Sequence, residues 1–123
     1  MKNKNPKAPK ELTKQWLIDH NIEVEGERVF HTSERSGRVE LKPAVVLGPK
    51  TRGRRMKYKH VAFYGGNYHQ YSFPLQRVIY AWNAGVAHAD MVIDHINNDP
   101  LDNRFENLQE ITQTKNLQRK ING

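Results

Sequence analysis

The sequence predicts a small α+β protein, in which an N-terminal antiparallel sheet and a helix precede a C-terminal unit of strand, loop, strand and helix. Strand-like runs flank residues 65–67, Gly-Gly-Asn, which favour a hairpin turn. Residues 72–85 carry apolar side chains at helical spacing, and residues 90–121 read as two short strands and a terminal helix. The length of 123 residues suits one domain.

The first half predicts one short helix and several strands. Residues 10–21 predict the helix, because Leu12 and Trp16 lie four positions apart. Residues 27–32 and 37–47 predict short strands that are interrupted at Ser36-Gly37 and Pro43. We therefore expect a small twisted sheet that carries a basic loop.

Residues 72–85 predict the core helix. Ser72 is a candidate N-cap, Pro74 suits a first helical turn, and Gly85 is placed to end the helix. The apolar stripe at i, i+3, i+4 and i+7 is formed by Leu75, Val78, Ile79 and Trp82. We expect this stripe to pack in the core.

The C-terminal unit brings polar side chains to the ends of its elements. Residues 91–96 predict a strand that ends at Asp94-His95, and residues 108–112 predict a second strand after a polar loop. Thr112 is the expected N-cap of a helix in which Asn116 lies one turn from the start. If this helix packs across the two strands, a carboxylate, an imidazole and an amide oxygen meet over one cleft.

Positive charge is concentrated in the first half of the chain. The net charge is +7, and residues 1–60 hold 15 Lys and Arg against 7 Asp and Glu. Residues 49–59 contain six basic residues and no acid, namely Lys50, Arg52, Arg54, Arg55, Lys57 and Lys59. Such a run suits contacts to nucleic-acid phosphates, and a solvated basic loop is the alternative.

The expected organisation is a disordered basic arm over residues 1–10 and a single domain over 11–123. Within the domain, residues 11–71 form a basic β-rich part, 72–85 the core helix and 90–121 the C-terminal unit. The absence of cysteine excludes disulfides, thiol nucleophiles and cysteine-based zinc sites. No apolar run reaches membrane-spanning length and the N-terminus lacks a signal-peptide core, so we expect a cytoplasmic protein without a membrane partner.

The stretch "DHINNDPLDNRFENL", followed by "T" and "KN", resembles the HNH endonuclease family of phage and intron-encoded proteins. The resemblance implies a ββα-metal motif over residues 90–121. His95 matches the first His and Asn107 the middle Asn, while Asn116 stands where other branches have the final His, as in an H-N-N variant. Asp94 matches the acidic metal ligand. The resemblance is strongest over about residues 70–120, and Gln76-Arg77 departs from the His-Arg of many relatives.

The residue types fit phosphodiester hydrolysis. His95 is suited to act as a general base, because imidazole has an ordinary pKa of about 6.5. Asp94 and Asn116 supply hard oxygen ligands for one divalent ion, Mg²⁺, for which Mn²⁺ can substitute. We expect Asn107 to hold the loop and orient His95. An EF-hand is excluded, because Phe105 stands where its last ligand must be Glu.

The resemblance implies a metal-dependent DNA endonuclease, encoded by a phage or mobile element, that leaves a 5′-phosphate and a 3′-hydroxyl. The partner is double-stranded DNA, nicked or cut in both strands by a monomer or weak dimer in the host cytoplasm, beside a phage packaging or replication protein. Further DNA contacts are expected from Arg104, Lys115, Arg119 and Lys120. The alternatives are a non-catalytic DNA-binding protein on an HNH scaffold and an RNA-binding or RNA-cleaving protein.

Overall fold

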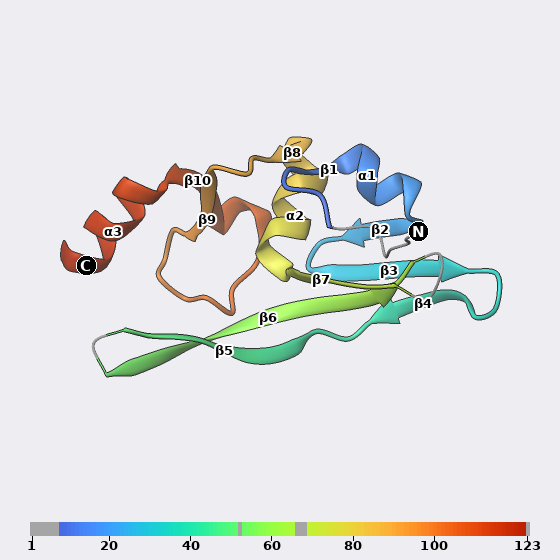
Figure 1. Ribbon diagram of the computed structural model, residues 1–123, viewed down its shortest axis with the longest axis horizontal. Helices are drawn as coiled ribbons and strands as arrows, with labels where there is room; N and C mark the ends of the chain where they lie inside the picture. Colours follow the sequence, from blue (N-terminus) through green and yellow to red (C-terminus); the bar gives the residue numbers. More distant parts are fainter. Residues whose placement is uncertain (1–7, 52, 66–68, 123) are drawn as a thin grey trace, which may run out of the picture.

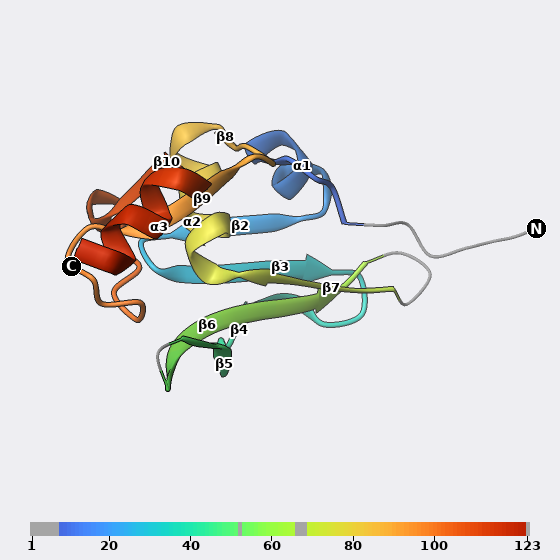
Figure 2. The same cartoon turned by 60° about the vertical axis from the view of Figure 1, so that its left-hand side comes forward.

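The computed structural model describes residues 8–51, 53–65 and 69–122, together with their side chains except those of residues 49, 51, 54 and 119–122. Most of the predicted basic arm therefore lies outside the described residues. The fold has two layers, with helices α1, α2 and α3 on one side of the β5, β6 and β7 strands (Figures 1 and 2). This confirms the predicted α+β class.

The N-terminal helix α1 (Lys14–Asp19) is shorter than the predicted helix over residues 10–21. Residues Leu12–Thr13 instead form strand β1, which pairs with Val86–Ala87, strand β8. Thr13 then caps the helix, because its Oγ1 accepts a hydrogen bond from the Trp16 N–H at 3.0 Å. The helix starts late because this pairing with a distant segment takes the first residues.

Two three-stranded antiparallel sheets follow, in the orders β2-β3-β4 and β5-β6-β7. The strands are β2 (Ile22–Glu25), β3 (Arg28–Ser33), β4 (Gly37–Leu41), β5 (Ala44–Thr51), β6 (Arg54–Tyr64) and β7 (Gln70–Pro74). The predicted hairpin is confirmed by the β6–β7 pairing of Tyr64 with Gln70, although residues 66–68 lie outside the described part. The expectation of a basic loop is wrong, since most of the basic run belongs to strands β5 and β6, whose register shifts between Leu47 and Lys50.

Helix α2 (Leu75–Ala84) lies at the centre of the protein and contacts elements of both halves. Three residues of its predicted stripe are buried, and Trp82 packs against the core from a half-buried position. Gly85 ends the helix at φ +97°, as expected. The prediction of Ser72 as N-cap is wrong, because Ser72 pairs with Ala62 in the sheet and the cap position is Pro74.

The C-terminal unit has the predicted order of strand, loop, strand and helix. Its elements are β9 (Met91–His95), the 3₁₀ turn η2 (Phe105–Asn107), β10 (Leu108–Thr112) and α3 (Gln113–Asn122). Strands β9 and β10 are antiparallel, with His95 opposite Leu108. Thr112 caps α3, since its Oγ1 accepts from the Lys115 N–H at 3.2 Å, and α3 contacts both strands.

None of the helices in the described ranges is long and apolar enough to cross a membrane.

Candidate active site

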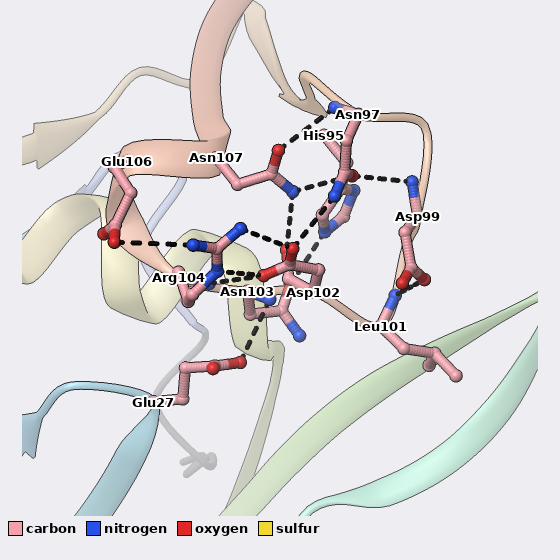
Figure 3. Close-up of polar contacts among 10 residues, drawn as sticks. All are labelled: Glu27, His95, Asn97, Asp99, Leu101, Asp102, Asn103, Arg104, Glu106 and Asn107. Carbon is pink, nitrogen blue, oxygen red and sulfur yellow. Dashed lines mark hydrogen bonds and ion pairs between the residues drawn. The ribbon is translucent and has the colours of Figure 1, made fainter.

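Three polar side chains are buried within the described part of the chain, and all three belong to the C-terminal unit. His95, Asn103 and Asn107 are 7%, 0% and 6% exposed. Figure 3 shows them around one polar loop between β9 and β10. Burying polar groups costs free energy unless they are hydrogen-bonded, so this concentration in a small protein marks a candidate functional site.

His95 is the last residue of β9, and its ring is held by the loop. Its Nε2 lies 2.7 Å from the Asn103 Oδ1, a short side-chain hydrogen bond inside the protein. The strand register fixes the backbone beneath it, because His95 pairs with Leu108 on β10. The imidazole is therefore anchored by both its strand and an amide.

Asn107 holds the other end of the loop through hydrogen bonds. Its Oδ1 accepts from the Asn97 N–H at 3.0 Å, and its Nδ2 donates to the Asn97 Oδ1 and the Asp102 carbonyl, both at 2.9 Å. Its own carbonyl accepts from the Ile96 N–H at 2.8 Å. These bonds hold the backbone directly after His95, whereas the side chain that bonds the ring is Asn103.

The loop itself is a series of side-chain-supported turns. The Asn97 Oδ1 accepts from the Asp99 N–H, and the Asp99 Oδ1 accepts from the Leu101 N–H. Asp102 accepts two hydrogen bonds from the Arg104 guanidinium, at 2.8 and 2.9 Å. Arg104 holds the pKa of the Asp102 carboxyl well below its ordinary value. The candidate DNA contact Arg104 is thus paired within the loop, and its side chain is about half exposed, at 53%.

Asp94 and Asn116, the predicted metal ligands, lie on neighbouring elements. Asp94 is half-buried on β9, and its Oδ2 accepts from the Gln109 Nε2 at 2.9 Å across the strand pair. Asn116 is half-buried on α3, the helix that contacts β9. Its Nδ2 donates to the Gln113 Oε1 at 3.4 Å, so that bond uses the nitrogen and not the oxygen.

A carboxylate and an amide oxygen are ligands that suit a hard divalent ion such as Mg²⁺. The described residues contain no group of three or more His, Asp or Glu arranged to hold a metal ion. A site that uses Asp94 and Asn116 does not depend on such a group, because asparagine is one of its two ligands. The donor chemistry therefore fits an ion with several positions open to water and phosphate.

The predicted DNA-contacting residues fall into two groups. Lys50, Arg55 and Lys57 are exposed and Lys59 is half-buried on strands β5 and β6, while Lys115 is exposed on α3. Arg52 lies outside the described residues, as do the side chains of Arg54, Arg119 and Lys120. Strands β5 and β6 run past β7 on the side of the molecule where the C-terminal unit lies (Figure 1).

Arg77 ties α2 to the segment that leads into β9. Its guanidinium donates to the carbonyls of Ala87, His88 and Met91 at 3.0, 3.2 and 3.4 Å. Burial lowers the pKa of Arg77, and the acidic Glu110 opposes that shift. The core helix thereby fixes the start of the strand that carries Asp94 and His95.

Sequence reasoning missed three residues that support the site. Asn103 bonds the His95 ring, Gln109 orients Asp94, and Glu27 accepts from the Asn103 N–H at 3.0 Å. The contact of Gln109 with Asp94 could have been predicted, because the two residues lie opposite one another in the β9–β10 register. Glu27 carries no local signal, since it lies 76 positions from its partner.

A comparison with known protein families finds a match that includes this site. Residues 73–118 match the family model described as HNH endonuclease. This confirms the predicted resemblance over that segment. The matched residues, here called the HNH segment, begin at the end of β7 and include Asp94, His95, Asn107 and Asn116. The family of this segment indicates a nuclease-type function with DNA as substrate. Searches of curated proteins and of solved structures found no significant match.

Proposed function

We propose that the protein is a metal-dependent DNA endonuclease that hydrolyses phosphodiester bonds at the HNH segment. The observation that carries the proposal is the burial of His95 beside Asp94, in a loop whose polar side chains hold one another in place. Three buried polar side chains cluster at the end of β9 and in the loop that follows it, although burying polar groups costs free energy unless they are hydrogen-bonded.

His95 is the general base in this proposal. As the water oxygen bonds to phosphorus, a water proton moves to a ring nitrogen of His95 and the bond from phosphorus to the 3′ oxygen breaks. The 3′ oxygen takes a proton from solvent, which leaves a 3′-hydroxyl and a 5′-phosphate. Asn107 contributes by holding the backbone after His95 through its bonds to Ile96 and Asn97.

Asp94 and Asn116 are the proposed ligands of one Mg²⁺, with Mn²⁺ as a substitute. When bound, the ion supplies Lewis-acid stabilisation of the charge on the phosphate and the leaving oxygen. Gln109 keeps the Asp94 carboxylate oriented through the 2.9 Å bond to its Oδ2. Asp94 and His95 are consecutive, so base and ligand stand on the same strand end.

Strands β5 and β6 form the proposed surface that holds duplex DNA. Every second residue of a strand points to the same face, so on β6 the side chains of Arg55, Lys57 and Lys59 share a face with those of Val61 and Phe63. Val61 and Phe63 are buried where α2 covers that face. Strands β5 and β6 continue past α2 toward the side of the HNH segment (Figures 1 and 2). A duplex on this face would neutralise the basic side chains while the HNH segment reaches its minor groove.

The proposed phosphate contacts beside the active site are Lys115, Arg119 and Lys120 on α3 and Arg104 on the loop.

One active site cuts one strand. A monomer therefore nicks DNA, whereas a weak dimer, or two successive events, breaks both strands. We assign the protein to a phage or mobile element, acting in the host cytoplasm beside a packaging or replication protein.

The experiment is cleavage of supercoiled plasmid by the purified protein with Mg²⁺ or Mn²⁺. We expect relaxed or linear product that disappears with EDTA and in the separate variants Asp94→Ala and Asn116→Ala. Structured RNA in parallel reactions tests the RNA alternative, which predicts faster loss of RNA than of plasmid. Salt-sensitive DNA binding without any cleavage by either metal would instead identify a DNA-binding protein on an HNH scaffold.

A further inference from the structure

The most deeply buried polar side chain of the described chain is the one that touches the His95 ring. Asn103 is 0% exposed, and its Oδ1 lies 2.7 Å from the His95 Nε2. We propose that Asn103 is a positioning residue that fixes the tautomer of His95, so that Nδ1 is the nitrogen that accepts the proton from water. This inference rests on the proposed function, in which His95 is the base.

The tautomer follows from what each atom can donate. An amide oxygen only accepts hydrogen bonds, so the ring nitrogen that faces it has to donate one. A neutral imidazole carries a single N–H, and placing it on Nε2 puts the basic lone pair on Nδ1. The reverse orientation of the amide would turn its NH₂ group toward Nε2 and place the ring proton on Nδ1, so the tautomer distinguishes the two arrangements.

The other end of the Asn103 amide has no partner within the described part of the chain. Its Nδ2 is buried and makes no hydrogen bond there. An unpaired buried donor costs stability, and natively buried polar groups are nearly always paired. The side chain is therefore poorly suited to a purely structural role, and its contribution is the bond to His95.

The Asn103 backbone is held by the N-terminal half of the protein. Its N–H donates to the Glu27 Oε1 at 3.0 Å, and Glu27 lies in the turn between β2 and β3, beside Gly26 at φ +62°. Figure 3 shows the resulting chain from Glu27 through Asn103 to His95. Two hydrogen bonds thus connect the turn between β2 and β3 to the proposed base, and this turn helps to fix the position of Asn103.

The first test measures the tautomer of His95 in the unsubstituted protein. In protein labelled with ¹⁵N at histidine, the two ring nitrogens of a neutral imidazole give distinct resonances, and their couplings to the ring protons show which one is protonated. The chain has six histidines, and the His95 signals are assigned by their loss in His95→Ala. We expect His95 to carry its proton on Nε2. A proton on Nδ1 in the unsubstituted protein would overturn the proposal.

Two variants then test the role of Asn103. Asn103→Leu removes the acceptor, and we expect a mixture of tautomers together with a fall in kcat of about 10- to 100-fold at unchanged KM for DNA, a part of what a general base contributes. Asn103→Asp keeps an acceptor oxygen. When the His95 ring is neutral in this variant, we expect the Nε2–H form to persist. Both variants retain the backbone bond to Glu27.

The tautomer and the cleavage assay separate this inference from the proposed function. An Nε2–H tautomer that depends on Asn103 in a protein without nuclease activity would support the positioning contact and refute the function. Cleavage by an unsubstituted protein whose His95 tautomer is unchanged in Asn103→Leu would support the function and refute the inference. If Asn103→Leu does not fold, the unsubstituted protein and Asn103→Asp still decide the question.

Discussion

Replacement of Asn107 by alanine tests the loop that holds His95. The substitution removes three side-chain hydrogen bonds of 2.9–3.0 Å from a residue that is 6% exposed. At about 1 kcal/mol of net stability for each bond, the free energy of unfolding should fall by about 3 kcal/mol. For a domain of this size that loss lowers Tm by roughly 10 °C.

The assay is thermal unfolding followed by circular dichroism, without added metal. Asn83→Ala is the matched control, because Asn83 is exposed on α2 and its side chain makes a single bond, to the Ile79 carbonyl. A change below about 0.5 kcal/mol is expected there, since the site is on the surface and alanine favours helix. If Asn107→Ala unfolds within 2–3 °C (roughly 1 kcal/mol) of the unsubstituted protein, the bonds drawn in Figure 3 do not hold the loop and the reasoning fails.

Three further predictions concern the strand anchor, the basic strands and the loop carboxylate. Arg77→Met should destabilise the protein by about 2 kcal/mol in urea unfolding, because three carbonyls lose a charged donor; no loss would contradict the anchoring role. The double variant Lys57→Ala/Lys59→Ala should reduce the slope of log K against log salt for duplex DNA by about 1–2, with the exposed turn residue Arg35 replaced by alanine as a control without effect. Asp102 has a folded-state pKa below its unfolded value of about 3.9, so its stabilisation is present above pH 4 or so and is lost as the pH falls through the folded pKa. The difference in unfolding free energy between the unsubstituted protein and Asp102→Asn should therefore be constant from pH 7 to about 5 and shrink below about 4, and a difference that grows on acidification would refute this assignment.

The elements of the HNH segment were predictable because their signals are local. The strand that ends at Asp94-His95, the cap at Thr112 and the helical stripe of α2 each depend on residues within a few positions of one another. The same holds for the hairpin between β6 and β7, which sits at a sequence of turn-forming residues. Local periodicity is sufficient when an element's own side chains decide its conformation.

The errors arose where distant segments decide the outcome. Ser72 has the chemistry of a helix cap, but it alternates with the buried Tyr71 and Phe73 and stays in the sheet. The first helix begins late because Leu12 pairs with Ala87, and Pro49–Lys59 is mostly strand because β5 and β6 pair with one another. Tertiary pairing overrides local propensity in each case.

The candidate site could be predicted only in part from the sequence, for the same reason. The stretch that contains His95, Asn107 and Asn116 indicated the HNH resemblance, and the match to residues 73–118 supports it. In a loop with several Asn residues, however, sequence alone does not distinguish Asn103, which bonds the ring, from those that form turns. The contact from Glu27 joins two halves of the chain and required the structure.

The most direct measurement of the central claim is the single-turnover rate of plasmid nicking with Mg²⁺ for the unsubstituted protein and for His95→Ala. Loss of a general base predicts a rate at least about 100-fold lower, with DNA affinity unchanged. Equal rates in the two proteins would show that any cleavage occurs without His95 and would contradict the proposed active site.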